Sequence, residues 1–229
     1  MAARRLLARE QLHESLSLNQ NVSLYMGGIA GLRAALAVLA AIVLLRHSQW
    51  PHLVGFSALG ALAALFGRFA PMLKRHGVVW LCALQLTAAV FLISLVSWWG
   101  GSGTVVVLTV ALVAAASSVV FNYWQLGGPG AVIIVFAAGA AMSPVDAWNV
   151  VLERTLVTAT GGVVAWLLTS ATDFLRVPEL ARIQAPSDPR RPLKYILLAG
   201  GRIGVGAAVL GDCRLRGVFS VRDRGNHWL

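Results

Sequence analysis

Few residues of this chain have the side chains and the spacing that reaction chemistry needs. The two cysteines stand far apart, Cys82 inside an apolar run and Cys213 in a basic tail. They match neither a disulfide framework nor a metal-ligand pattern. Of the five histidines only His47 and His52 are near neighbours, and no carboxylate or thiol joins them. We therefore expect no metal site, no cofactor and no enzymatic activity.

Arginines within or beside apolar runs are the residues that could bind a ligand. Arg33 lies inside the first long apolar run, and Arg68 follows the second. Ionisable groups inside a membrane are costly and usually mark a pathway or a paired site, and a guanidinium offers forked donors that match a carboxylate. We interpret Arg33 and Arg68 as substrate-binding residues. The alternative for Arg33 is an anchor, because it lies only about 7–8 Å inside the membrane edge and could extend to the headgroups.

Neutral polar side chains in the same apolar runs could supply further hydrogen bonds to a ligand. The alternative is that they join one helix to another, which is the common role of such residues in membranes. The sequence does not decide between the two roles. These residues are Gln85, Thr87, Thr109, Ser117, Ser118 and Asn122.

The composition defines the environment of these side chains. Apolar residues make up 58% of the 229 residues and charged residues only 12%, with a mean hydropathy of +0.73. A soluble domain carries about 25% charged residues, so a soluble enzyme, a disordered tail and a disulfide scaffold are excluded. The net charge of +10 could indicate nucleic acid, but in so apolar a chain it is typical of cytoplasmic loops. We predict a lipid bilayer as partner and no nucleic acid.

Six segments are long and apolar enough, or nearly so, to cross the bilayer. We predict that they are helices, because open strands cannot satisfy their backbone amides in lipid. Two of them, 53–66 and 130–142, are short. The second of these follows Gly128-Pro129-Gly130, which we interpret as a helix break. Short segments interrupted by Gly and Pro can mark the broken helices of transporters, or this one can be an ordinary tight loop. The predicted fold is an all-α polytopic bundle. Its predicted spans are 28–45, 53–66, 78–99, 104–123, 130–142 and 150–171.

The distribution of Lys and Arg predicts the orientation of the bundle. With the N-terminus inside, the inner segments hold eleven of these cations, whereas the outer side holds two, Arg46 and Arg154. An excess of this kind marks the cytoplasmic side, so both ends of the six-helix unit are predicted to be cytoplasmic. At the outer start of the last span, Ser143, Pro144 and Asp146 match a capping box with proline in the tolerated first position.

The chain divides by composition into four parts. We predict a cytoplasmic N-terminal segment (1–27), a six-helix transmembrane unit (28–175), a cytoplasmic linker rich in Pro and Arg (176–193) and the start of a second unit (194–229). In this last part Arg202 opens a run of small and branched residues, as Arg33 does in the first span. The run stops at Gly211 before a charged stretch, so we interpret this second unit as truncated or aberrant.

Four sequence features resemble the fusaric acid resistance (FUSC) family of bacterial inner-membrane proteins. They are Leu32-Arg33-Ala-Ala-Leu with Trp50-Pro51 after it, Gly55-Phe-Ser-Ala-Leu-Gly60, Gly128-Pro129-Gly130 before a span ending at Pro144, and Arg202-Ile-Gly-Val-Gly-Ala-Ala. The resemblance covers 28–210 and implies efflux of aromatic or other small organic carboxylic acids by a multi-pass protein. Members of the family usually carry two six-helix units, whereas this sequence has one and the start of another.

Two functions follow as hypotheses. The first is efflux of small organic anions across the bacterial inner membrane, with Arg33 as the first cation that the substrate meets. The second is a membrane scaffold or half-transporter subunit, or a truncated product, that is inactive without a second unit. We expect a homo-oligomer or a second transporter half as the protein partner. No P-loop is present, so coupling to ATP would need another chain.

Overall fold

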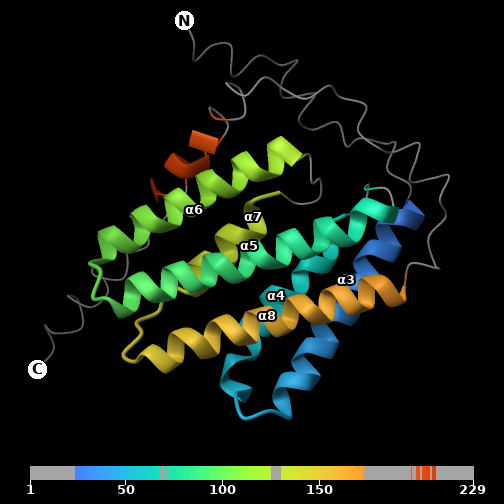
Figure 1. Ribbon diagram of the computed structural model, residues 1–229, viewed down its shortest axis with the longest axis horizontal. Coiled ribbons are helices and arrows are strands. Elements are labelled where there is room, and N and C mark those ends of the chain that lie inside the picture. Colours follow the sequence, from blue (N-terminus) through green and yellow to red (C-terminus); the bar gives the residue numbers. More distant parts are fainter. Residues whose placement is uncertain are drawn as a thin grey trace, which may run out of the picture.

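The computed structural model describes residues 24–67, 70, 72–124 and 130–172, with isolated helical positions between 197 and 209. Arg68, Gly128, Pro129 and Arg202 lie outside the described residues. So do nearly all of the predicted N-terminal segment and the whole of the predicted linker. Every regular element in the described part is helical (Figure 1). The elements are α3 (Leu24–Arg46), η1 (Pro51–Leu53), α4 (Val54–Ala61), η2 (Leu62–Leu65), α5 (Met72–Trp98), α6 (Gly103–Trp124), α7 (Val132–Ala140) and α8 (Trp148–Ala171).

Four of these helices are long and apolar enough to cross a membrane, namely those of α3, α5, α6 and α8. This confirms a helical bundle of membrane-protein type. The two predicted spans that looked short contain short helices. The span 53–66 corresponds to the continuous run of η1, α4 and η2, which extends from Pro51 to Leu65 and so begins two residues earlier. The span 130–142 contains α7. A topology of six crossings with both ends in the cytoplasm belongs to the proposal below.

The helices form two triplets, and in each triplet a short helix lies between two long helices in the sequence. The first is α3, α4 and α5, and the second is α6, α7 and α8. Helix α4 packs mainly against α3 and α8, whereas α7 packs mainly against α6 and α5. Each short helix therefore contacts the long helix before it and the last long helix of the other triplet. The contacts of the two triplets correspond: α4 with α3 and α8 in the first matches α7 with α6 and α5 in the second.

Helices α5 and α8 form the centre of this arrangement and run antiparallel. Along α5, His76 contacts Ser170, a Cβ on Gly162 would touch Ala83, and Phe91 contacts the ring of Trp148. The residue numbers of the contacts on α8 therefore decrease as those on α5 increase. An antiparallel central pair is what a two-fold axis perpendicular to the helices would produce, so the second triplet is inverted relative to the first.

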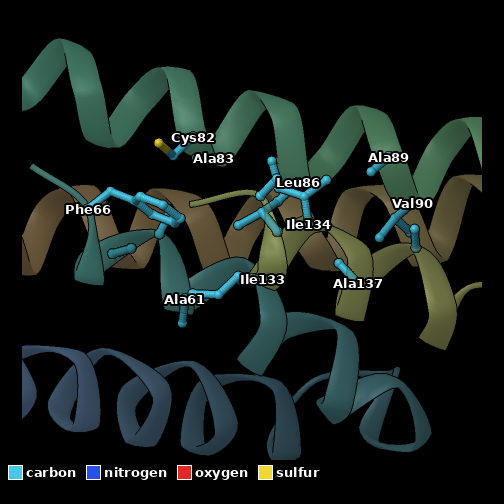
Figure 2. Close-up of a cluster of buried hydrophobic side chains, with 14 of the residues drawn as sticks. Ala61, Phe66, Cys82, Ala83, Leu86, Ala89, Val90, Ile133, Ile134 and Ala137 are labelled. Carbon is cyan, nitrogen blue, oxygen red and sulfur yellow. The ribbon is translucent and has the colours of Figure 1, made fainter. Parts of the chain in front are cut away.

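The interior is filled by small and branched side chains between the short helices and α5. Figure 2 shows Ala61 and Phe66 from the first triplet and Ile133, Ile134 and Ala137 from α7 gathered below α5, which contributes Leu86, Ala89 and Val90. Phe66 also contacts the ring of Phe121 on α6, with centroids 5.2 Å apart. Both short helices therefore lie inside the bundle.

Helices α4 and α8 approach so closely that only glycine fits at their crossing. A Cβ on Gly60 would overlap the carbonyl oxygen of Thr158, and one on Gly161 would overlap that of Ser57. On the next face of α8, a Cβ on Gly162 would come within 2.8 Å of the Ala83 side chain of α5. Small residues are the means by which membrane helices bring their backbones together.

Described positions of the predicted second unit are helical and lie against α6. A Cβ on Gly200 would lie 2.9 Å from the carbonyl oxygen of Ala115, and one on Gly204 would lie 3.0 Å from that of Ala111. Figure 1 shows this segment beside α6. The outer face of α6 is thus covered in part by residues beyond the first six helical segments.

Candidate anion site

Arg33 lies inside the bundle and bonds the end of α8. Its side chain is only 6% exposed. Its Nε donates to Thr172 Oγ1 at 2.6 Å, and its Nη2 donates to the Thr172 carbonyl oxygen at 3.3 Å. Thr172 is the C-cap of α8, where the helix dipole is negative and a cation is favoured. The guanidinium therefore faces protein, in contrast to the extended anchor considered from the sequence.

A second buried arginine, Arg75, lies in α5 at the same end of the molecule. Figure 1 shows the start of α3, the start of α5 and the end of α8 together there. Arg75 is 1% exposed, and a Cβ on Gly67, which has a φ of 72°, would come within 3.0 Å of its Cγ. Arg75 is one of the eleven cations that the charge count places on the inner side, and the structure places it within helix α5. Arg68, the other predicted binding residue, lies outside the described residues.

A third buried arginine, Arg154, lies toward the opposite end of α8 and is 8% exposed. Its Nη1 donates to the Ser143 carbonyl oxygen at 3.1 Å and its Nη2 to that of Pro144 at 3.4 Å. Its Cζ lies 5.4 Å from the centroid of the Phe56 ring on α4. The charge count places Arg154 on the outer side, and the predicted span 150–171 contains it; the structure adds that its side chain is buried on α8.

The helical spacing of Arg154 could have revealed its burial. It stands four, seven and eleven residues before Thr158, Gly161 and Ala165, which are all buried on α8. Residues at such intervals share one face of a helix, so a stripe of small residues predicts that an arginine in line with them points inward.

The capping box predicted at Ser143, Pro144 and Asp146 does not form. Helix α8 begins at Trp148, and its N-cap is Ala147, which has extended backbone angles and makes no capping side-chain bond. Asp146 is exposed. The carbonyl oxygens of Ser143 and Pro144 instead accept hydrogen bonds from Arg154, so a tertiary contact has replaced the local one. Gly130, with a φ of 69°, precedes α7 at the predicted helix break.

Three of the six neutral polar residues donate a hydrogen bond within their own helix. Thr87, Thr109 and Asn122 each donate to a carbonyl oxygen four residues earlier. Two others have buried oxygens without a hydrogen-bond partner among the described residues, namely Gln85 Oε1 and Ser118 Oγ. Ser117 is buried as well. The bonds that the structure gives to these residues are therefore not bonds between helices.

The fold and the arginines together define a class, a helical membrane protein of two inverted triplets with buried cations toward both ends of α8. Comparison with protein families, with curated proteins and with solved structures finds no match. The function is therefore inferred from the geometry of the chain itself and from the resemblance seen in its sequence.

Proposed function

We propose that this chain is a FUSC-like transporter that exports aromatic or other small organic carboxylic acids across the bacterial inner membrane. The observation that carries the proposal is the pair of inverted triplets with short helices, α4 and α7, in corresponding positions inside the bundle. Secondary transporters are commonly built from inverted repeats with interrupted helices, and their substrates bind where the repeats meet. The fold therefore favours transport over a purely structural role.

The buried arginines support an anion as the substrate. Arg33 and Arg154 are each more than nine-tenths buried and lie toward opposite ends of α8. Burying a guanidinium in a membrane-spanning helix is costly unless it binds a partner that uses its charge. Its planar fork of donors matches a carboxylate. A small organic acid that enters from the cytoplasm meets Arg33 first in this scheme and Arg154 later.

The proposed topology has six crossings, with each triplet crossing three times and both ends of the unit in the cytoplasm. An odd number of crossings in the first triplet is what inverts the second. Labelling with a membrane-impermeant maleimide should therefore reach a cysteine in place of Ser102, which is exposed between α5 and α6. It should miss one in place of Lys74, exposed near the start of α5. A Cys213→Ser background removes the tail thiol, and Cys82 is buried. The reverse pattern would contradict the proposed orientation.

Transport itself is tested in inverted inner-membrane vesicles from bacteria that express the chain. We expect a fluorescent aromatic carboxylate to accumulate in these vesicles faster than in vesicles with an empty vector. The matched uncharged ester, which lacks the carboxylate, controls for passive entry. Equal accumulation of the acid in both kinds of vesicle would refute transport by this chain.

A half-transporter is the second candidate, and the contacts on α6 favour it. Gly200 and Gly204 lie against Ala115 and Ala111, so further helical chain packs onto the first unit as a second unit would. In that case the chain works only in a homo-oligomer or with another half. Size-exclusion chromatography in detergent, read with light scattering, separates the possibilities, because a monomer that is active in vesicles excludes the half-transporter.

A further inference from the structure

Arg154 has donor capacity that the described protein atoms leave unused. Its two Nη groups bond carbonyl oxygens, but its buried Nε has no hydrogen-bond partner among the described residues. Among the described residues, this guanidinium contacts the carbonyl oxygens of Ser143 and Pro144 and the ring of Phe56, and none of these groups carries a charge. Carbonyl dipoles satisfy N–H groups without cancelling the charge, and a buried charge without compensation carries a cost of several kcal/mol.

A second unused donor lies in the same region. Ser94 on α5 is fully buried, and its Oγ has no hydrogen-bond partner among the described residues. One turn further along α5, Ser97 Oγ donates to the Ser143 carbonyl oxygen at 3.5 Å, the same oxygen that accepts from Arg154. Residues three apart are neighbours on a helix surface. Ser94 therefore lies one turn deeper than the point where α5 and Arg154 share an acceptor.

Both groups lack a hydrogen-bond acceptor among the described residues, and for Arg154 an acceptor with negative charge would also offset the buried positive charge. An oxyanion could accept from Arg154 Nε and from the Ser94 hydroxyl, and it would neutralise the guanidinium at the same time. Hydrogen bonds between a guanidinium and an anion are about twice as strong as neutral ones. The ring of Phe56 lies beside the guanidinium and attracts its positive charge.

We infer that Arg154 and Ser94 form an anion-binding site toward the Trp148 end of α8, and that its ligand is an oxyanion. Two sources offer that chemistry, the carboxylate of a small organic acid and the phosphate of a lipid headgroup. The first source rests on the proposed function, whereas the second does not. The alternative role of Arg154 is only to hold the Ser143 and Pro144 carbonyl oxygens in place.

The test measures two kinds of binding by the purified chain, with benzoate and phosphatidylglycerol as the probes. Benzoate binding is measured in neutral detergent, and retention of phosphatidylglycerol over phosphatidylcholine is measured by mass spectrometry. The variants are Arg154→Gln, Arg154→Lys and Ser94→Ala. Arg46→Gln is the control, since Arg46 is an exposed arginine at the end of α3. Benzoate binding is repeated in an Arg33→Gln background, so that binding at the other end of α8 does not hide a loss.

We expect one of the two anions to lose about tenfold or more in affinity in both Arg154 variants and severalfold in Ser94→Ala. Arg46→Gln should bind as the parent does. Weaker binding of benzoate in the variants identifies a carboxylate site, and weaker retention of phosphatidylglycerol alone identifies a lipid site. If Arg154→Gln does not fold, Arg154→Lys and Ser94→Ala decide the outcome. Unchanged binding of both anions in the variants, or no binding by the parent, overturns the inference.

Failure of this site and failure of transport can be told apart. Variants that bind both anions as the parent does, while the parent transports acids, overturn the site and leave the proposed function intact. A parent that binds benzoate or lipid through Arg154 but moves no acid leaves the site intact and overturns the proposed function.

Discussion

Replacing Arg33 by Gln is expected to reduce organic-acid flux by about tenfold or more, while membrane insertion and the amount of folded protein stay unchanged. Gln can still donate one hydrogen bond to the end of α8, but it lacks the charge that an anion needs. Hydrogen bonds to charged groups contribute about 1.5–3 kcal/mol, and each 1.4 kcal/mol corresponds to a factor of ten. The measurement is the initial rate of uptake of an aromatic carboxylate into inverted vesicles.

The contact between Arg33 and Thr172 provides the control that separates binding from structural support. Thr172→Val removes the hydroxyl that accepts from Arg33 Nε but keeps the backbone carbonyl and the guanidinium. Arg33→Lys keeps the charge and loses the fork. If Arg33 binds the substrate, Thr172→Val keeps most of the flux and Arg33→Lys loses much of it. If Thr172→Val abolishes flux as Arg33→Gln does, Arg33 only clamps α3 to α8.

Replacing Gly60 by Ala is expected to destabilise the bundle by about 1–3 kcal/mol, the usual cost of overpacking. The added methyl group would overlap the carbonyl oxygen of Thr158, which is backbone and can move only if α4 and α8 separate. Gly55→Ala is the matched control, since it lies on the same helix and its Cβ would meet nothing within 4 Å. Unfolding in detergent, followed by circular dichroism with increasing sodium dodecyl sulfate, measures both variants.

The two alanine variants should differ in stability, and only Gly60→Ala should be less stable than the parent. Alanine is a better helix former than glycine by up to about 1 kcal/mol in soluble helices, so Gly55→Ala should leave the bundle equally stable or slightly more stable. If Gly60→Ala is as stable as Gly55→Ala, the close crossing of α4 and α8 is not a determinant of the fold.

The positions of the helices could be predicted from the sequence because apolar runs decide them. The predicted segments and the observed helices end within a few residues of each other in α3, α6 and α8, and the two short segments contain the two short helices. Their inverted arrangement could not be predicted, since it depends on which helices meet. No local pattern predicts that Gly60 packs against Thr158 and Gly162, or that Arg33 contacts Thr172 across 139 positions of the chain.

The candidate site was predicted only in part. Arg33 could be predicted because it is an arginine inside the first long apolar run. Arg75 and Arg154 were not predicted as site residues, because a count of cations uses them only to orient the bundle and does not ask which way their side chains point. The capping box was wrong for a related reason: Ser143 and Pro144 have suitable residue types, but their carbonyl oxygens serve as acceptors for a buried arginine. A local motif cannot reveal that competition.

Uptake of benzoate by liposomes that contain only the purified chain tests the proposed transport most directly. We expect saturable uptake above that of protein-free liposomes. This expectation follows from the two inverted triplets and from the buried Arg33 and Arg154 toward opposite ends of α8. They also predict that this uptake falls by about tenfold or more in Arg33→Gln. Uptake equal to that of protein-free liposomes, from a chain shown to be folded and inserted, would contradict transport by this chain alone.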